Sequence, residues 1–600
     1  MTGNGELQYA VTRIRNGIAD TVIAKSPLGL DIDGYSLSQL KHSGKSEKKS
    51  IHSMINRIHG KNNPLRDEFE EHQLQFESSN GNKLVMILRA YNDGIAFRYG
   101  IDAESPGEFK VNRERTGFTI PSGKAWLQPY DKVTLWTPAY EKPFQNGIPV
   151  GTSSPNEEGW CFPALFETGK HWILLTESDL DANYAGSHLQ PEAPGGLYTL
   201  RFPEKEEGMG LGHAEPTIAL PWLSPWRVII TGETAATIVE SDLVDRLARP
   251  SAMKNTEWIK PGIASWSWWS DHDSPQKPNE LNAFTDLAAA MNWPYTLIDA
   301  NWNLLPEKEF QAILNHVKSK NIGAWLWYNS GGPHNEVTEQ PRDRMHIREA
   351  RRKEFEQLQA WGVVGIKVDF WQSDKQDIIR QYIELLEDAA DYKIMVNVHG
   401  CTIPRGWSKT YPHLMTMESV WGAESYSFAS NYPMEIPAQN VIYAFTRNVI
   451  GPMDYTPVTF TNQTYPHLTT NAHELALSVV FESGVQHFAD RVSAYLNLPK
   501  PVKEFLMNVP SAWDETRLLS GYPGKDIVMA RRKGTTWYIG GINGENQEKD
   551  MTIDLSRLGI KTYTLFTDDS KNSFAVQPLT TASPLQLKLK AFGGFVAVSQ

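Results

Sequence analysis

The stretch that decides the fold is Gly365-Ile366-Lys367-Val368-Asp369-Phe370-Trp371. It is an apolar run with β-branched residues, and a carboxylate interrupts it near its end. Such a run is typical of a strand that is buried on both faces of a parallel sheet. The strand would deliver Asp369 at its carboxyl end, where parallel barrels carry their reactive groups.

From about residue 257 to 500, strand-like runs alternate with helical ones. Apolar residues recur at spacings of three and four over 306–320 and 347–361, and the strand-like runs cover 262–269, 295–299, 322–328, 364–370, 394–398 and 414–417. Repeated β–α units imply a parallel sheet, and this many units favour a closed (β/α)8 TIM barrel. We assign the barrel to residues 251–500. Its last two units, expected near 440–453 and 481–490, have the weakest pattern.

On both sides of the predicted barrel, the sequence has strand-like runs without helical ones between them. Residues 84–91 and 95–99 are β-rich and are separated by Asn92-Asp93-Gly94, which is a hairpin signal. Similar alternation recurs up to residue 250 and returns after residue 500. The sequence therefore predicts a multidomain protein with an N-terminal β-sandwich over residues 1–250, the central barrel, and a small C-terminal β-sandwich over residues 501–600.

The composition limits the partners of the chain. A net charge of −12 and the lack of any basic run argue against nucleic acid as the main partner. No apolar stretch is long enough to cross a membrane as a helix. Because Cys161 and Cys401 are the only cysteines, we expect no disulfide framework, and any metal ion should be bound by oxygen. The oligomeric state stays open.

Several predicted barrel strands end in polar groups that do not suit a core. Because the carboxyl ends of barrel strands all lie on one rim, these groups should face a common cleft. They are Asp271, Asp299, Asn329, Asp369, Asn397 with His399, Glu418 and Glu424. Paired carboxylates are the catalytic groups of glycoside hydrolysis. The 20 Trp and 22 Tyr residues offer flat faces for sugars, although many of them belong to the core.

Six segments carry a joint pattern. They are Ser267-Trp268-Trp269-Ser270-Asp271, Leu297-Ile298-Asp299-Ala300-Asn301-Trp302, Lys367-Val368-Asp369-Phe370, residues 399–412, the pair Glu418 and Glu424, and Gly451-Pro452-Met453-Asp454-Tyr455-Thr456-Pro457. Together they resemble glycoside hydrolase family 97, and the resemblance spans nearly the whole chain. The family has the same order of domains as predicted above. The resemblance implies a glycoside hydrolase.

The resemblance also implies a branch of the family. The inverting branch has a base Glu directly after the histidine that matches His399, and it lacks an acid at the strand position of Asp369. This chain has Gly400 after His399 and an acid at position 369. It is therefore similar to the retaining, α-galactosidase-like branch, which implies Asp369 as the nucleophile and Glu424 as the general acid/base.

A calcium ion close to the substrate is a further implication of the resemblance. The implied ligands are Glu177 of the sandwich domain with Glu418 and Glu424, and oxygen ligation suits this ion. A second set of side chains is expected to contact the sugar, and Lys367 should also help to keep Asp369 ionised because both lie on one face of the strand. This set consists of Lys367, Trp268, Asp299, Asn397 and His399.

We therefore expect a calcium-dependent, retaining, exo-acting glycoside hydrolase that releases terminal α-galactose. An α-glucosidase or a β-L-arabinopyranosidase of the same family stays open, since galactose and glucose differ only in the orientation of one hydroxyl. The alternative from another class is a sugar-binding protein without catalysis, although no catalytic acid is missing. The N-terminus has no signal-peptide pattern, so we expect either a cytoplasmic protein or a periplasmic one whose export signal has been removed.

Overall fold

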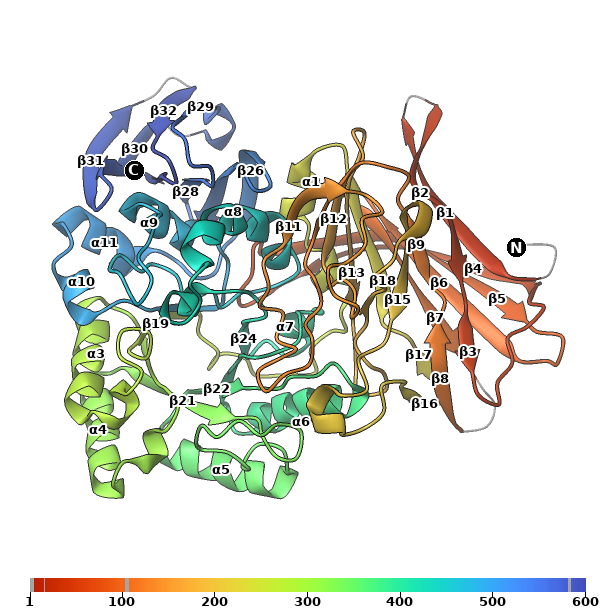
Figure 1. Cartoon of the computed structure of the whole chain (residues 1–600), viewed down its shortest axis with the longest axis horizontal. Helices are drawn as coiled ribbons and strands as arrows, with labels where there is room; N and C mark the ends of the chain where they lie inside the picture. The colour runs from red at the N-terminus through yellow and green to blue at the C-terminus, as the bar shows by residue number, and fades with distance from the viewer. Residues whose placement is uncertain (1–4, 16, 103–106, 560, 581–583) are drawn as a thin grey trace.

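The computed structural model describes residues 5–15, 17–102, 107–559, 561–580 and 584–600. Figure 1 shows a β-rich N-terminal part, a central part in which strands and helices alternate, and a smaller C-terminal β part. One continuous cluster of buried apolar residues joins all three parts, and a second cluster lies within the C-terminal part. No helix in the described ranges is long and apolar enough to span a membrane.

The N-terminal part confirms the predicted β-sandwich. Its largest sheet has the order β11-β10-β12-β13-β18-β7-β6-β5-β4 with β17 beside β7, and two smaller sheets have the orders β1-β2-β9-β15-β14 and β16-β8-β3. Tyr9 of β1 meets Phe97 of β7 at 5.0 Å between ring centroids, so two of these sheets face each other. The strands are β1 (Leu7–Arg15), β2 (Ile18–Leu28), β3 (Leu30–Ile32), β4 (Lys41–Ile55), β5 (Leu65–Glu77), β6 (Lys83–Tyr91), β7 (Gly94–Ile101), β8 (Glu108–Glu114), β9 (Gly117–Thr119), β10 (Lys124–Leu127), β11 (Gln145–Pro149), β12 (Ala164–Glu167), β13 (Trp172–Ser178), β14 (His188–Leu189), β15 (Leu197–Arg201), β16 (Thr217–Ala219), β17 (Trp222–Leu223) and β18 (Trp226–Gly232).

The central part is a nearly closed parallel barrel with the strand order β24-β23-β22-β21-β20-β19-β25. Each of the six predicted strand runs coincides with one of these strands, apart from one or a few residues at its ends. The strands are β19 (Gly262–Trp266), β20 (Tyr295–Ile298), β21 (Gly323–Asn329), β22 (Gly365–Asp369), β23 (Met395–Val398), β24 (Leu414–Met417) and β25 (Val485–Phe488). The longer helices around them are α3 (Pro278–Ala290), α4 (Glu307–Ser319), α5 (Arg348–Trp361), α6 (Gln376–Asp391), α8 (Tyr432–Phe445), α9 (Asn471–Val480) and α11 (Lys500–Asn508).

The described residues contain seven barrel strands and not the eight that the sequence pattern predicts. Residues 440–453, where one of the last units was expected, hold helical turns instead. Backbone hydrogen bonds bridge the gap between β24 and β25. Gly484 N donates to Met415 O at 3.0 Å, and Asp454 N donates to Met417 O at 2.9 Å. This closure brings Asp454 to the rim on which the strands end.

The C-terminal part is a small antiparallel β-domain, as predicted. One sheet has the order β26-β27-β28-β33-β30-β31, and β29 pairs with β32. The buried apolar side chains between the two sheets form a core of their own. The strands are β26 (Glu515–Tyr522), β27 (Asp526–Lys533), β28 (Thr536–Asn543), β29 (Lys549–Ile553), β30 (Thr562–Ser570), β31 (Ser573–Thr580), β32 (Leu585–Leu589) and β33 (Gly594–Ser599).

Candidate active site

Strand β22 positions Asp369. All of its residues are buried, and Lys367 and Asp369 are in register with Trp327 and Asn329 of β21. Two donors orient the carboxylate: the indole Nε1 of Trp327 lies 3.1 Å from Oδ2, and the backbone N of Phe370 lies 2.8 Å from Oδ1. The strand end thus holds the Asp369 carboxylate in one orientation.

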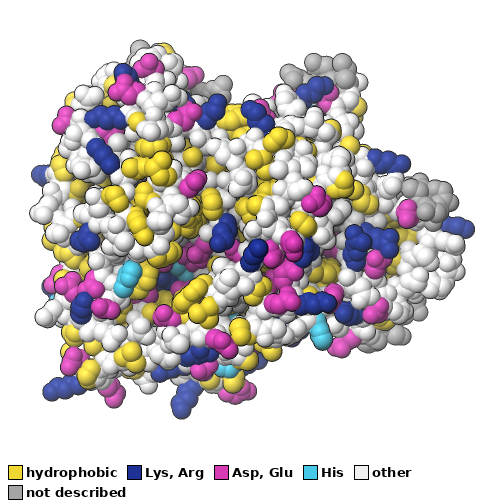
Figure 2. Space-filling model, in the orientation of Figure 1, with side chains coloured by type: hydrophobic (Ala, Val, Ile, Leu, Met, Phe, Trp, Pro, Cys, Tyr) yellow, Lys and Arg dark blue, Asp and Glu magenta, His cyan; other side chains and the backbone are white. Residues whose placement is uncertain are grey.

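The charge of Asp369 depends on its neighbours. Burial raises the pKa of Asp369 to about 7, and the nearby carboxylates of Glu418 and Glu424 act in the same direction. The cations of Lys367 and His399 oppose this shift. On the face shown in Figure 2, acidic and histidine side chains are visible in a hollow left of the centre of the view, over the central part of the molecule.

Lys367 is a buried cation among carboxylates. Its Nζ lies 3.2 Å from Asp299 Oδ2 and 3.9 Å from Glu424 Oε1. Burial lowers the pKa of Lys367, but these carboxylates outweigh burial and raise the pKa above its usual value, so the ammonium stays charged. Both oxygens of Asp299 have donors within the protein, because Oδ2 also accepts from Trp266 Nε1 at 2.7 Å and Oδ1 accepts from Ala300 N at 2.8 Å.

Two carboxylates meet at one nitrogen of His399. Its Nδ1 lies 3.1 Å from Glu418 Oε1 and 3.4 Å from Glu424 Oε1. Glu418 follows β24, and Glu424 lies in the 3-10 helix η5 (Ala423–Ser427). Burial lowers the pKa of His399, but the Glu418 carboxylate outweighs burial and raises the pKa well above its usual value. The Oε1 atom of Glu424 is buried and accepts no hydrogen bond within the described part of the chain.

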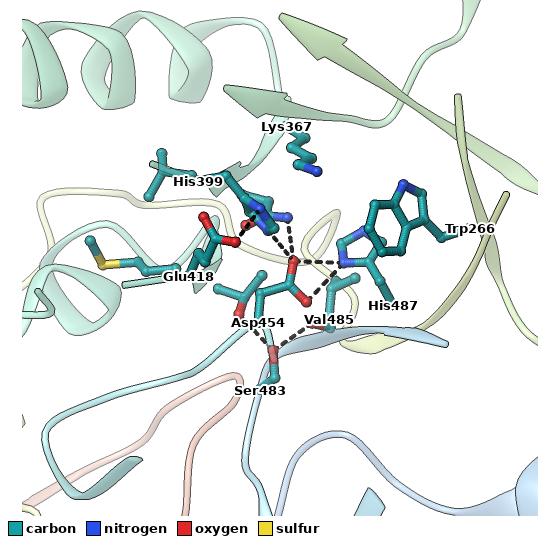
Figure 3. Close-up of polar contacts among 12 residues, drawn as sticks. Trp266, Lys367, His399, Glu418, Asp454, Ser483, Val485 and His487 are labelled. Carbon is teal, nitrogen blue, oxygen red and sulfur yellow. Dashed lines mark hydrogen bonds and ion pairs between the residues drawn. The ribbon is translucent and has the colours of Figure 1, made fainter. Parts of the chain in front are cut away.

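Asp454 holds the other side of His399, as Figure 3 shows. Its Oδ2 lies 2.7 Å from His399 Nε2, 2.7 Å from Asn397 Nδ2 and 2.9 Å from His487 Nδ1. Burial raises the pKa of Asp454, but the His487 and His399 rings outweigh burial and hold the pKa far below its usual value. Because Nε2 of His399 is committed to Asp454, Nδ1 is the nitrogen that faces the cleft carboxylates.

Gly400 leaves room for Asp369. Its φ of +49° lies in the left-handed region, and a Cβ atom at this position would lie 3.0 Å from Asp369 Oδ1 and 2.9 Å from the backbone N of Phe370. A side chain at position 400 and an acid at position 369 therefore compete for the same space.

Trp268 joins the same network through one neighbour. Its ring stacks on Trp266 with centroids 5.6 Å apart and on His272 with centroids 4.1 Å apart. Trp266 donates to Asp299, which pairs with Lys367. The structure therefore brings all the predicted sugar-contacting residues together, either directly or through one shared partner.

Glu177 lies in β13, at the contact between the sandwich and the barrel. Its carboxylate pairs with Arg227 and with Arg405, whose Nε lies 2.5 Å from Oε1, and the hydroxyl of Ser187 donates to Oε2 at 2.6 Å. Arg405 also pairs with Asp374, with its Nη2 2.7 Å from Oδ2. Burial raises the pKa of Glu177, but the arginines outweigh burial and lower the pKa. Both carboxylate oxygens of Glu177 thus have donors within the protein.

Glu141 is a sandwich-domain acid on which the charges of the cleft carboxylates act, and no sequence pattern pointed to it. Burial raises the pKa of Glu141 well above its usual value, and the charges of Glu418 and Glu424 add to the shift. Glu141 lies on the loop between β10 and β11, here called the crossing loop (residues 128–144), which reaches from the sandwich to the barrel in Figure 1. An isolated acid in a loop has no sequence signal that would reveal such a charge interaction.

The crossing loop is fixed on both sides. Tyr140 donates its hydroxyl to Asp374 Oδ2 at 2.6 Å. The side chain of Gln439 in α8 makes hydrogen bonds of 2.9 Å with both the backbone N and the backbone O of Phe144. Within the loop, Gln128 Nε2 donates to the carbonyl of Tyr140 at 2.7 Å. The sandwich domain therefore completes the rim of the barrel.

The carboxylates of Glu418 and Glu424 suit a hard cation, whereas His399, whose raised pKa keeps it charged, is not a ligand in that state. One atom each of His399, Glu418 and Glu424 lies within 4.8 Å of the others, and in the described part of the chain this is the group with such spacing. Neither Glu177 nor Glu141 belongs to it. A cation would offset the negative charge that raises the pKa of Glu141. Carboxylate oxygens are the ligands that calcium prefers.

Matches with one family cover all three parts of the chain. Residues 1–250 match the family model described as "Glycosyl-hydrolase 97 N-terminal", and residues 258–420 match the one described as "Glycoside hydrolase 97". Residues 512–599 match the model described as "Glycosyl-hydrolase 97 C-terminal, oligomerisation". A probable retaining alpha-galactosidase of Streptomyces bingchenggensis is 32% identical over 96% of this chain and 87% of its own length. A retaining alpha-galactosidase of Bacteroides thetaiotaomicron is 29% identical over 96% of this chain and 91% of its own length.

Solved structures show the same architecture. A beta-arabinopyranosidase aligns with 100% of this chain and 97% of its own at a TM-score of 0.95 and 30% identity. An enzyme of glycoside hydrolase family 97 from Pseudoalteromonas sp. strain K8, in complex with panose, aligns with 100% of this chain and 97% of its own at a TM-score of 0.85 and 23% identity. The chain therefore belongs to glycoside hydrolase family 97 and is a glycoside hydrolase.

Proposed function

We propose that the chain is a retaining, exo-acting α-galactosidase that uses a calcium ion. The observation that carries the proposal is the pairing of Asp369 with Gly400, because the acid stands on the strand end and the glycine leaves it the space that a side chain would fill. The two relatives named as retaining or probable retaining alpha-galactosidases support the same assignment.

The chemistry is a double displacement. Asp369 attacks the anomeric carbon while Glu424 protonates the leaving oxygen, and the sugar becomes bound to Asp369 as an ester. Glu424 then takes a proton from the water that attacks the same carbon and releases the sugar. The two carboxyls need to be about 5 to 5.5 Å apart for these roles. Lys367 favours the ionised form of Asp369, and its Nζ lies 3.9 Å from Glu424.

The residues proposed to hold calcium are Glu418 and Glu141, with a weaker contact to Glu424. The charges of Glu418 and Glu424 act on Glu141, which lies on the crossing loop of the sandwich domain. When bound, the ion supplies positive charge that offsets the clustered carboxylates. Contact to Glu424 should be indirect, because a cation lowers the pKa of a carboxyl that has to donate a proton.

Two variants distinguish the proposed ligand from the one that the resemblance implied. Glu141→Gln should lower the calcium content in elemental analysis and raise the calcium concentration needed for half-maximal activity. Glu177→Gln should lower the free energy of unfolding and leave the calcium content unchanged. The opposite pair of results would assign the ligand role to Glu177, and full activity of metal-free enzyme would remove calcium from the proposal.

A β-L-arabinopyranosidase is the second candidate, and the structural similarity to a beta-arabinopyranosidase supports it. A β-L-arabinopyranoside has the ring hydroxyls of an α-galactoside and lacks only the exocyclic CH2OH group, so one cleft can accept both sugars. Rates of hydrolysis on an aryl α-galactoside, β-L-arabinopyranoside and α-glucoside would rank the candidates. The α-galactoside is expected to be the fastest substrate.

The stereochemistry of the product tests the mechanism. Two displacements at one carbon restore the starting configuration, so the first sugar released should keep the anomeric configuration of the substrate. Proton NMR of the earliest product reads this before mutarotation. An inverted product from the unmodified enzyme would remove Asp369 from the role of nucleophile.

A further inference from the structure

Trp136 is an unusual residue at the edge of the cleft. It is 48% exposed and is the one exposed tryptophan in the described ranges of the chain. Its neighbour Leu135 is also exposed, at 44%. Both residues belong to the crossing loop, which brings the sandwich domain to the barrel rim. An indole that stays in water beside a catalytic cleft offers a flat face to a ligand.

A line of aromatic rings connects Trp136 to the nucleophile. The Trp136 ring meets the Phe370 ring with centroids 5.6 Å apart, and Phe370 meets Trp327 at 5.8 Å. Trp327 donates to the Asp369 carboxylate, and Phe370 directly follows Asp369 in the chain. The exposed indole is therefore two ring contacts from the reacting carboxylate.

Hydrogen bonds fix the segment that presents Trp136. Gln372, just after β22, donates its Nε2 to the carbonyl of Leu135 at 2.7 Å. The backbone N of Trp136 donates to Thr134 Oγ1 at 3.2 Å, and the hydroxyls of Thr134 and Thr137 lie 2.8 Å apart. The position of the indole is thus tied to the same strand end that carries Asp369.

We propose that Trp136, together with Leu135 and Phe370, binds the leaving group of the substrate, and that this leaving group is a sugar ring. The inference rests on the proposed function. The terminal galactose has to lie among the buried carboxylates, because they react at its anomeric carbon. The half-exposed ring of Trp136 at the rim therefore contacts the leaving group, on the other side of the scissile bond. A pyranose has an apolar C–H face that stacks on an indole, and its hydroxyls can stay in water.

The test compares two substrates that share the cleaved sugar. α-Galactosyl fluoride has no leaving sugar, whereas an α-1,6-linked galactosyl-glucose disaccharide has one. For Trp136→Ala, the ratio of kcat/KM for the disaccharide to kcat/KM for the fluoride should fall about tenfold, since truncation of a buried aromatic contact typically costs that much in binding. Trp136→Phe, which keeps a flat ring, should recover most of the ratio.

Leu496→Ala is the matched control, because this residue is also exposed, at 42%, and lies in α10 (Val492–Leu496) outside the crossing loop. It should leave the ratio unchanged. An unchanged ratio for Trp136→Ala, with both substrates still turned over, would overturn the inference alone. Lack of turnover of both galactosides by the unmodified enzyme would overturn the proposed function and the inference with it.

Discussion

The side chain of Asp369 has two fixed donors and two cations around it, and each part of this environment has a separate consequence. The donors Trp327 and Phe370 set the orientation of the carboxylate, whereas Lys367 and His399 set its charge. Removal of the carboxylate and removal of a neighbouring charge should therefore give different kinetic signatures.

Replacement of Asp369 by Ala should abolish the turnover of natural glycosides, because the proposed ester cannot form. Azide should restore turnover of an activated aryl glycoside by occupying the vacated space. Since only one displacement remains, the glycosyl azide should have the inverted configuration in proton NMR. Glu424→Ala is the comparison: activated substrates should still form the ester, and its breakdown should become limiting. A retained configuration in the azide product of the Asp369 variant would contradict this prediction.

Activity should fall on the acid side of about pH 7, because Asp369 has to be ionised to act as the proposed nucleophile and burial raises its pKa to about 7. Lys367 lowers that pKa, so Lys367→Met should move the acid limb of the kcat/KM profile to higher pH. A pH profile on an activated aryl glycoside measures this. A limb that stays in place in the variant would show that another group controls it.

Most of the site residues were predictable from the sequence because they follow strands. Asp369, Asp299 and Glu418 end apolar runs, and their common rim follows from the parallel sheet. Glu141 and His487 were not predicted as site residues. Glu141 comes from another domain, and nothing in its local pattern separates it from a solvated loop acid. His487 lies inside strand β25, and from the sequence a residue in the middle of a buried strand is expected to belong to the core.

At the scale of elements, the turn after β23 is as important as the strand β22 beside it. Gly400 accepts hydrogen bonds through its carbonyl from the backbone N atoms of Trp371 and Gln372, at 3.0 and 3.2 Å. The two connections that follow β22 and β23 are thus joined at this glycine. A change at Gly400 should displace the carboxylate without unfolding the barrel.

Gly400→Ala should lower kcat by about 10²-fold, since the added Cβ would crowd Asp369 and a misplacement of about 1 Å is enough for such a loss. Gly362→Ala is the matched control. This glycine also has a positive φ, +78°, but a Cβ there would meet nothing within 4 Å. The control should share the backbone strain and keep its activity. Equal losses of kcat in the two variants would attribute the effect to strain rather than to crowding.

The alternation of strand-like and helical runs predicted the barrel strands β19 to β24 correctly. The prediction of a further strand at residues 440–453 was wrong. The strands β19 to β24 are apolar runs bounded by turns, and the structure contains each of them. The segment between β24 and β25 contains Pro452 and Pro457, which have no amide hydrogen to donate to a sheet. This segment approaches β24 through the amide of Asp454 and forms no strand.

At the scale of the whole molecule, a buried chain of charges joins the sandwich to the barrel. It runs from Glu114 through Arg227 to Glu177 and on through Arg405 to Asp374. All five side chains are nearly inaccessible to solvent. The domain order was predictable from changes in sequence period, but this network was not, because its members are distant in the chain.

Arg405→Met should destabilise the protein by about 3–5 kcal/mol, because it leaves Glu177 and Asp374 buried without their shared cation. Chemical denaturation followed by fluorescence measures the loss. Lys500→Met, which removes the exposed partner of Glu504, should leave the unfolding curve unchanged. If the Arg405 variant unfolds like the unmodified protein, the network does not hold the two domains together.

The crossing loop has a consequence for how such enzymes can be rebuilt. The barrel is the domain that one would exchange between relatives, yet the crossing loop, which borders its cleft, belongs to the sandwich domain. Two sets of hydrogen bonds join this loop to the barrel, those of Gln439 with the backbone of Phe144 and that of Tyr140 with Asp374. A chimera that takes its sandwich from one parent and its barrel from another has to preserve both sets, so the natural unit of exchange is the two domains as a block.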